Sequence, residues 1–420
     1  MLEDNETIIL KEVSKLRNSL IRRTMELIKI PTVNPPGEKY KECVDYLSNE
    51  LSDLGVNVEI INVPEHYVEK YAPWGENLPR LILLGKLEGI KERPILCFNG
   101  HYDVVPAGSN WVTDPFNPVI RNERIYGRGA TDMKGAIASI ITAIEAIVNS
   151  GISLNGTILV SFVPDEETDG QTGSGYLMSK NIVKPNYCVV GEPSGISNIW
   201  IAHKGALWME IKVYGSSAHG SSPWLGINAF EKVVKIVNEI NKRIKPSLEQ
   251  KISRYRTETP RERRPTITIG GYVKCGKAIN IVPDFCTFTI DRRLIPEENV
   301  DDAENEILTL IEELKAKDPE LKVSVRILSK FNACGISENH DLCVKLKEAI
   351  KCVLKHEPTL TMCNAGLDMR YFIDAGVPTI AYGPGKLSLA HSSNEYVPIN
   401  DLEVAAKVYS LLILKILKKR

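Results

Sequence analysis

The sequence predicts an α/β protein in which a smaller α+β domain is inserted into a domain with a mostly parallel central sheet. Helical patterns alternate with short apolar strands such as Ile95–Asn99 and Thr157–Val163, and this alternation is typical of parallel sheets. From about residue 206 the order becomes strand, helix, strand, strand, helix, strand, which is that of a ferredoxin-like unit. The first pattern returns near residue 329. We therefore expect one domain of residues 1–205 and 329–420 and a second of residues 206–328.

The elements of the larger domain follow from the spacing of its apolar residues. Ile9, Val13 and Leu16 recur at helical spacing, and Pro31 ends that pattern. Helices are predicted at Thr7–Ile28, Tyr40–Leu54, Met133–Val148, Asp341–Cys352 and Leu402–Lys418. Further strands are predicted at Val56–Val63, Leu81–Leu84, Tyr187–Val190, Ile199–Ala202 and Thr379–Tyr382.

The inserted domain is expected to contain four strands and two helices. The strands are Leu207–Tyr214, Thr266–Tyr272, Cys286–Ile290 and Val323–Ile327, and the helices are Asn228–Ile240 and Val300–Leu314. The charged stretch Glu249–Arg264 is interpreted as a solvated loop. A nucleic-acid patch is the weaker interpretation, because no aromatic residue beyond Tyr255 is interleaved with its charges.

Composition excludes several classes of protein. The 420 residues include 52 Lys and Arg against 53 Asp and Glu, so a nucleic-acid or anionic-membrane partner is not expected. The longest apolar stretch, Ala136–Val148, contains Glu145 and is too short to cross a bilayer. The nine cysteines form no CxxC motif, so neither a disulfide framework nor a zinc–thiolate site is expected. The acidic N-terminus does not resemble a signal peptide, and we expect a cytoplasmic protein.

Histidine and carboxylate residues follow several predicted strands. His101 and Asp103 share one face of a strand end, so Asp103 can hold one ring nitrogen and leave the other for a metal. Taken alone, His101 is better explained as a histidine in a turn. Asp132 stands just before a long helix, where a helix cap and a cation-bridging ligand explain it equally well.

Further acids and a histidine occur in similar places. Glu166 and Glu167 follow a buried strand, in Asp165-Glu-Glu167, where three carboxylates repel one another unless cations or hydrogen bonds compensate. Glu192 ends another strand and His391 lies in a later loop; each has a plain surface loop as its alternative. Because ligand sites of α/β proteins form at such strand ends, the set together predicts a site for two divalent cations bridged by one Asp.

Short motifs in register resemble a known family. They are His101-Tyr-Asp-Val-Val-Pro106, Gly127-Arg-Gly-Ala-Thr-Asp-Met-Lys-Gly135, Asp165-Glu-Glu167, Gly191-Glu-Pro193, Ser217-Ala-His-Gly-Ser-Ser-Pro223, Asn280-Ile-Val-Pro283, Asp291-Arg-Arg293, and His391 with Asn394-Glu395. The chain thereby resembles the M20 family of two-metal metallopeptidases and amidohydrolases. This family contains acetylornithine deacetylase, succinyl-diaminopimelate desuccinylase and related dipeptidases, and the deacylase branch is the most similar.

The resemblance implies a zinc-peptidase-like catalytic domain that holds two divalent ions per subunit, Zn²⁺ or else Co²⁺. One ion would be held by His101, Asp132 and Glu192, and the other by Asp132, Glu167 and His391. Glu166 would be the general base and Asp103 the residue that orients His101. The peptide bond between Asp132 and Met133 would be cis. The inserted domain would be a lid through which two copies form a homodimer.

The resemblance also implies how the substrate is held. His219 would cross from the lid of a second subunit to steady the tetrahedral oxyanion, and Asn280 and Arg293 would reach down from the lid. Arg293 is preferred over Arg292 because the family pattern is Asp-x-Arg. Arg370 is a further candidate for a substrate carboxylate. These groups indicate a small N-acyl amino acid or a dipeptide as substrate.

The leading hypothesis is therefore a metal-dependent deacylase of N-acyl amino acids, of the acetylornithine deacetylase or succinyl-diaminopimelate desuccinylase type. A dipeptidase or carboxypeptidase of the same family is the first alternative, because Tyr102 stands where the biosynthetic deacylases often carry Thr. A non-catalytic binder of amino acids and a metal-free glycosidase with paired carboxylates are the alternatives from other classes.

Overall fold

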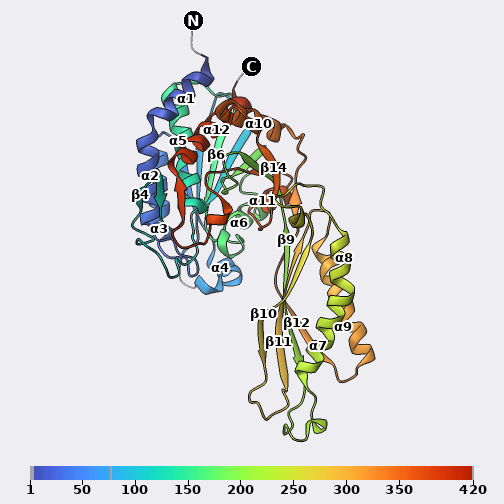
Figure 1. Cartoon of the computed structure of the whole chain (residues 1–420). Helices are drawn as coiled ribbons and strands as arrows, with labels where there is room; N and C mark the ends of the chain where they lie inside the picture. Colours follow the sequence, from blue (N-terminus) through green and yellow to red (C-terminus); the bar gives the residue numbers. More distant parts are fainter. Residues whose placement is uncertain (1–3, 76–77, 419–420) are drawn as a thin grey trace. The chain divides into compact units, whose positions relative to one another are not determined.

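The protein is described by a computed structural model that covers residues 4–75 and 78–418, so the first three residues of the acidic N-terminus lie outside it. The chain divides into two compact units. Unit 1 comprises the chain up to Ile201, Ile336–Leu360 and the chain from Leu367 onward, and unit 2 comprises Ala202–Gly335 and Thr361–Gly366. The boundaries expected from the sequence are residues 206 and 328. Figure 1 shows the elements of both units, coloured along the sequence.

The larger sheet, most of whose strands belong to unit 1, is mixed, which corrects the expectation of a mostly parallel sheet. Its strand order is β1-β2-β6-β3-β7-β15-β8-β13, and β14 also pairs with β8. The pairs β3–β6, β3–β7 and β7–β15 are parallel, and the pairs β1–β2, β2–β6, β8–β15 and β8–β13 are antiparallel. Parallel neighbours need a crossover helix, which α5 supplies between β3 and β6, whereas only the short α4 lies between β1 and β2. The strands are β1 Asn57–Asn62, β2 Leu81–Leu87, β3 Ile95–His101, β6 Thr157–Val163, β7 Tyr187–Val190, β8 Asn198–His203, β13 Cys334–Gly335, β14 Thr359–Cys363 and β15 Thr379–Ala381.

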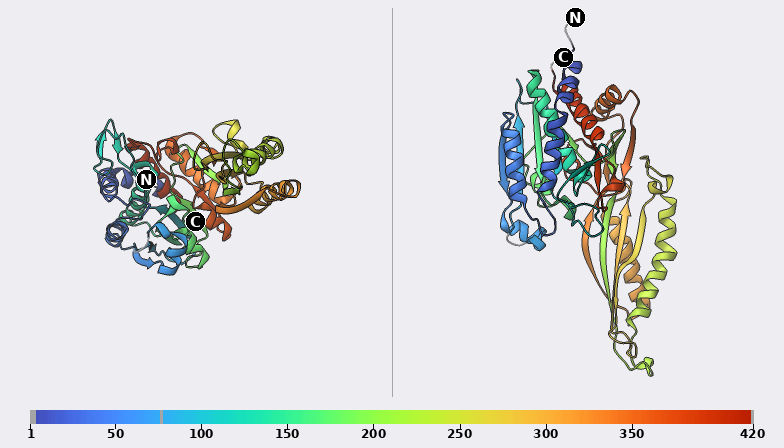
Figure 2. Two further views of the ribbon diagram at one scale, coloured as in Figure 1. Left: turned by 90° about the horizontal axis from the view of Figure 1, so that it is seen from below. Right: turned by 60° about the vertical axis from the view of Figure 1, so that its left-hand side comes forward.

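Helices cover the sheet of unit 1 and bury its centre. Strands β3 and β6 are buried at every position, as expected for central strands with both faces covered. Helix α5 packs against α12, α1 and α2, and Figure 2 shows these helices side by side in the upper part of unit 1. The helices are α1 Asn5–Lys15, α2 Arg17–Lys29, α3 Tyr40–Ser52, α4 Glu65–Tyr71, α5 Gly135–Ser150, α6 Ser174–Ser179, α10 Asp341–Leu354, α11 Met369–Asp374 and α12 Ile399–Leu417.

Two details of unit 1 differ from the prediction. The helix expected over Thr7–Ile28 is broken at Leu16 into α1 and α2, and the break is invisible in the sequence because the apolar spacing continues across it. A small antiparallel sheet of order β16-β5-β4 was not predicted, because its strands have only three residues each; they are β4 Val119–Arg121, β5 Arg124–Tyr126 and β16 Tyr396–Pro398. Among the described residues, no helix combines the length and apolar character needed to cross a membrane.

Unit 2 has the predicted order of strand, helix, strand, strand, helix, strand. Its antiparallel sheet has the order β10-β11-β9-β12, with β9 Gly205–Tyr214, β10 Thr266–Cys275, β11 Phe285–Leu294 and β12 Lys322–Phe331. One face of the sheet packs on α7 Ala229–Glu239 and α9 Val300–Lys317 around a core that includes Leu207, Ile236 and Phe288. The stretch interpreted as a loop begins inside α8, Lys245–Gln250, and includes a short 3₁₀ turn at Pro260–Arg263.

One pair of cysteines is bridged, in a chain for which no disulfide framework was expected. Cys275 at the end of β10 and Cys286 on β11 face each other across the ladder and form a disulfide. This bond could not be predicted from the sequence, because the two cysteines are eleven positions apart and their contact depends on the register of the hairpin. Cys43, Cys97 and Cys188 are buried thiols in unit 1.

Candidate active site

The predicted ligands of unit 1 gather where the parallel strands end. His101 is the last residue of β3, Glu166 and Glu167 follow β6, and Glu192 follows β7. Asp132 precedes α5 and His391 lies in the loop before β16. Because β3, β6 and β7 are parallel neighbours, their carboxyl ends share one edge of the sheet, which is where ligand sites of α/β folds form.

His101 has one ring nitrogen fixed and the other facing acids. Its Nδ1 lies 3.0 Å from the backbone carbonyl oxygen of Asp103, and because a carbonyl only accepts, Nδ1 carries a proton and donates. Its Nε2 lies 3.1 Å from Oδ1 of Asp132 and 3.8 Å from Oε1 of Glu192. Burial acts to lower the pKa of His101, but Asp103 and Asp132 raise it well above its ordinary value. The ring is thus oriented as a metal-ligating histidine is oriented.

Asp132 presents its two oxygens to two different histidines. Oδ1 faces Nε2 of His101 at 3.1 Å, and Oδ2 lies 3.4 Å from Nε2 of His391. The His391 nitrogen also lies 2.8 Å from Oε2 of Glu167. The helix-cap interpretation of Asp132 has no support, since the start of α5, which lies wholly within the described residues, has no side-chain cap. The predicted cis peptide bond between Asp132 and Met133 is confirmed.

The acids of the cluster are buried or half-buried, and within the described part of the chain one of their oxygens lacks a hydrogen bond. Single atoms of His101, Glu166 and Glu192 lie within 4.8 Å of one another, and so do atoms of His101, Asp132 and Glu167. Burial, together with the charge of Glu192, raises the pKa of Glu166 well above its usual range, and burial with Asp132 does the same for Glu192. Among the described residues, Oε1 of Glu192 has no hydrogen-bond partner.

The donor set fits divalent cations. Buried carboxylates are costly unless a cation or hydrogen bonds compensate, and the orphaned oxygen of Glu192 marks a place where a cation would do so. Hydrogen bonds to Asp132 and Glu167 raise the pKa of His391 to about 11. The same two acceptors that hold an imidazolium there can hold a metal ion instead. Imidazole with carboxylates suits Zn²⁺ and similar ions.

Asp103 holds the turn that carries Glu166 and Glu167. Its Oδ1 accepts a hydrogen bond from the backbone N–H of Glu166 at 3.2 Å, and its Oδ2 accepts one from Glu167 at 3.3 Å. Its carboxylate also lies 3.5 Å from Nδ1 of His101. Asp103 therefore touches both the histidine at the end of β3 and the acidic turn after β6.

Sequence reasoning missed the polar residues that support this cluster. Arg80 is fully buried and its Nε donates to Oδ2 of Asp165 at 2.7 Å, while Asn34 donates through one amide nitrogen to both Asp103 and Asp165. Asp165 has a φ of 64°, the left-handed conformation that turns the chain from β6 into the acidic turn. Arg80 and Asn34 belong to no motif, and only a contact map would have joined them to the site.

The predicted residues of unit 2 lie in two of its loops and on one strand. His219 and Asn280 are exposed, and their loops are joined because Gly220 N–H donates to the carbonyl of Asn280 at 2.8 Å and Val282 N–H to that of Ala218 at 2.9 Å. Nδ1 of His219 accepts a hydrogen bond from the backbone N–H of Ser221 at 3.2 Å. The two side chains are thus carried by one paired loop structure.

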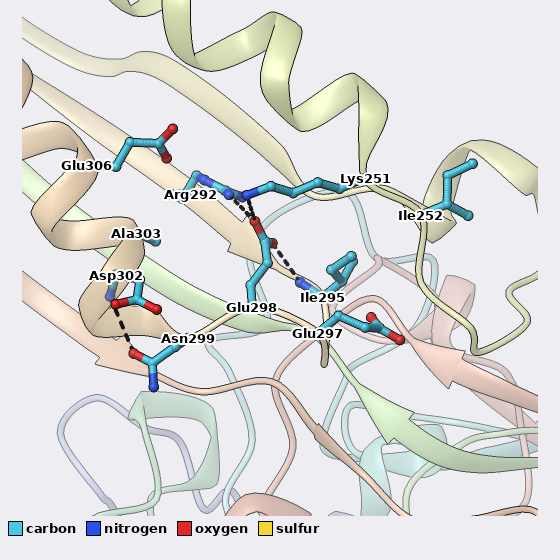
Figure 3. Close-up of a pocket in the computed structure, with 10 residues that line it drawn as sticks. All are labelled: Lys251, Ile252, Arg292, Ile295, Glu297, Glu298, Asn299, Asp302, Ala303 and Glu306. Atoms are coloured by element: carbon cyan, nitrogen blue, oxygen red, sulfur yellow. Dashed lines mark hydrogen bonds and ion pairs between the residues drawn. The ribbon is translucent and has the colours of Figure 1, made fainter.

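Arg292 and Arg293 point in different directions, as neighbours on a strand do. Arg292 is buried beside a cavity of about 530 Å³ in unit 2, where its Nη2 donates to Glu298 at 2.6 Å and Lys251 binds the same oxygen (Figure 3). Arg293 shares a face with Asp291, whose carboxylate accepts from it at 2.8 and 3.1 Å, and its guanidinium lies over the ring of Trp208. Only Arg293 is partly exposed.

Arg370 lies in unit 1, on α11. Its Nη2 donates to Oδ1 of Asp169 at 2.7 Å, and its side chain is almost wholly buried.

Known proteins resemble this chain in sequence and in fold. The family model described as Peptidase family M20/M25/M40 matches residues 97–415. Acetylornithine deacetylase of Photorhabdus laumondii is 28% identical over 92% of this chain and 94% of its own, and succinyl-diaminopimelate desuccinylase of Nitrosospira multiformis is 28% identical over 78% and 85%. The structure of the dipeptidase Dug1p from Saccharomyces cerevisiae superposes with a TM-score of 0.76 at 16% identity, covering 98% of both chains. A dinuclear metal-binding M20 peptidase of Bacillus subtilis gives 0.69 at 14% identity, covering 97% and 100%.

Fold, donor set and relatives together define the class of protein as a metal-dependent hydrolase. The chain belongs to the peptidase family M20/M25/M40, which confirms the resemblance seen in its motifs.

Proposed function

We propose that this enzyme hydrolyses the amide bond of a small N-acyl amino acid, using two divalent cations held in unit 1. The observation that carries the proposal is Asp132, whose two oxygens face two imidazoles from opposite sides. His101 and Glu192 would complete one cation site, and Glu167 and His391 the other. Support for a pair of ions also comes from the Bacillus subtilis structure, whose title describes a dinuclear metal-binding peptidase.

The side chains then have distinct tasks in the reaction. When bound, the two cations would activate a water and polarise the amide carbonyl. Glu166 would take the proton of that water and deliver it to the leaving amine, and its raised pKa suits a group that must hold a proton between these steps. Asp103 holds the backbone of Glu166 and so places its carboxylate.

We assign substrate binding to the residues of unit 2 and to Arg370. His219, contributed by a second copy of the chain, would donate to the oxyanion, and Asn280 and Arg293 would hold the substrate carboxylate. This part of the proposal requires a homodimer formed through unit 2. A strict monomer in sedimentation at micromolar concentration would contradict it. A cytoplasmic location is also proposed, on the ground that seven of the described cysteines, including Cys43, Cys97 and Cys188, are free thiols and one pair, Cys275 and Cys286, is bridged.

A substrate panel tests the proposal. The purified protein, loaded with Zn²⁺ or Co²⁺, would be given N-acetylornithine, N-succinyl-diaminopimelate and a set of dipeptides. We expect turnover of an acyl compound, in line with the deacetylase and desuccinylase relatives. Turnover of dipeptides alone would favour the second candidate function, a dipeptidase, which the likeness to Dug1p supports.

A further inference from the structure

A buried ion pair beside the candidate metal site has no role in the proposed reaction. Nη1 of Arg128 donates to Oε2 of Glu395 at 2.7 Å, and both side chains are almost wholly buried. Arg128 precedes Asp132 by four positions, and Glu395 follows His391 by four. The pair thus joins two segments that are distant in the sequence. One segment carries Asp132, which faces both histidines, and the other carries His391.

The carboxylate of Glu395 holds the backbone at Asp132. Its Oε1 accepts hydrogen bonds from the backbone N–H of Thr131 at 2.8 Å and from that of Asp132 at 3.1 Å. The carbonyl of Glu395 also accepts the N–H of Gly127 at 3.0 Å. A carboxylate that accepts several backbone N–H groups forms strong, charge-assisted bonds. The peptide that carries Asp132 therefore has its position fixed from the Glu395 side.

The guanidinium of Arg128 holds the backbone at His391. Besides Glu395, it donates to the carbonyl oxygens of His391 at 3.4 Å, Ser392 at 3.3 Å and Ala107 at 3.2 Å. His391 has a φ of 60°, in the left-handed region that non-glycine residues seldom occupy and that needs support from the surroundings. Arg128 supplies such support directly at the residue whose ring faces Asp132 and Glu167.

We propose that Arg128 and Glu395 are positioning residues that set the spacing between Asp132 and His391, so that the two side chains face one cation together. The inference rests on the proposed metal site. Neither residue touches the reacting atoms; each acts through the backbone of a ligand. Both residues contact the backbone of a ligand and not its side chain. Replacing either residue should therefore displace the ligand that it holds without changing any ligand side chain.

A second buried arginine in unit 1, paired with the half-buried Glu145, provides the control. Arg23 on α2 donates to Oε2 of Glu145 on α5 at 2.8 Å and to Glu50 at 2.5 Å, and its side chain is as buried as that of Arg128. Its hydrogen-bond partners among the described residues are Glu50, Thr142 and Glu145, none of which is a candidate ligand. If Arg128 and Glu395 serve stability alone, the two pairs should behave alike when they are replaced.

The experiment measures metal binding and folding separately in full-length variants. Glu395→Gln keeps the shape of the side chain, and the double variant Arg128→Met with Glu395→Leu removes the pair and leaves no lone buried charge, a change that can be neutral for stability. Arg23→Met with Glu145→Leu is the control. Zn²⁺ and Co²⁺ affinities would be measured on metal-stripped protein by calorimetry and by the visible Co²⁺ spectrum, and folding by the thermal midpoint without metal.

We expect both Arg128–Glu395 variants to bind metal about 10- to 100-fold more weakly, the range found for residues that orient metal ligands, with a changed Co²⁺ spectrum. The control should bind within about twofold of the parent protein, whatever its thermal midpoint, since it touches no ligand. The inference is wrong if the double variant binds both ions like the parent, or if the control weakens binding equally. If the parent binds neither ion, the metal site and this inference fall together. If it binds ions but turns over no substrate in the panel, only the proposed function fails.

Discussion

The residues proposed for catalysis differ in their surroundings between the two units. In unit 1, His101, Asp132 and Glu192 are each less than 10% exposed, and Nε2 of His101 lies 3.1 Å from Asp132 and 3.8 Å from Glu192. In unit 2, His219 and Asn280 are exposed, and their side chains extend from loops. The proposed metal ligands thus all belong to unit 1, whereas three of the proposed substrate-binding residues, His219, Asn280 and Arg293, belong to unit 2.

This difference predicts which property each substitution changes. Glu166→Ala should lower kcat about 10²- to 10⁴-fold because the proton of the attacking water loses its acceptor. Metal content should stay near that of the parent protein, since Glu166 is not among the proposed ligands. Steady-state rates and metal analysis on the same preparation would check this. Unchanged hydrolysis would remove Glu166 from the mechanism.

The buried support of unit 1 predicts a large effect on stability. Arg80→Met should lower the free energy of unfolding by about 3–5 kcal/mol, because it leaves the carboxylate of Asp165 buried without its ion-pair partner. Arg254→Met in unit 2 is the control: its side chain is 76% exposed and reaches Glu297 only at 4.0 Å, so its effect should stay within about 1 kcal/mol. Urea unfolding of both variants measures the contrast. Equal losses would show that burial does not decide the outcome.

The same contrast explains what could be predicted from the sequence. His101, Asp132, Glu167 and Glu192 could be proposed from the sequence because each follows a strand or precedes a helix, whereas His391, which lies in a loop, was proposed through the family motif. Arg80 and Asn34 were missed because their contacts with Asp165 join segments with no common local pattern. Arg128 and Glu395 stood inside quoted motifs, yet their pairing appears only once the chain has folded.

The helices and strands, like the site, could be predicted only in part from the sequence. Helices such as α3 and α9 have strong apolar periodicity, and their starts were placed correctly. The antiparallel pairs at the edges of the larger sheet could not be predicted, because a run of apolar residues does not indicate whether the neighbouring strand runs parallel or antiparallel. The break at Leu16 was likewise hidden, because it depends on local backbone angles and leaves the apolar spacing intact.

A substitution in unit 2 should separate catalysis from metal binding. His219→Ala should reduce kcat about 10²- to 10³-fold if its imidazole donates to the oxyanion, because a charged intermediate then loses one donor. Zn²⁺ affinity should not change, since His219 belongs to a different unit from the proposed ligands. His356→Ala, which alters an exposed histidine outside the proposed site, is the control. Weakened Zn²⁺ binding in the His219 variant would place this residue among the ligands instead.

The last prediction has the smallest expected effect. It tests whether the contribution of an ion pair to the free energy of unfolding depends on its burial or on the unit in which it lies. In unit 2, Asp318 accepts hydrogen bonds from Lys232 at 2.8 Å and Lys235 at 3.0 Å, and these lower its pKa to about 2. A lowered carboxyl pKa stabilises the fold above the ordinary value of 3.8, and that contribution is lost as pH falls through 2. Asp318→Asn should therefore cost about 1 kcal/mol at pH 7, with the difference from the parent shrinking between pH 4 and pH 2.

The matched control for Asp318 lies in unit 1, where Lys41 and Asp45 form an ion pair on α3 with side chains 72% and 50% exposed. Asp45→Asn should change the free energy of unfolding by no more than about 0.5 kcal/mol at any pH in this range, because water screens both charges. Urea titrations at several pH values would compare the two variants. If the exposed pair in unit 1 contributed as much as the half-buried pair in unit 2, burial could not be the reason why the two regions of this enzyme differ.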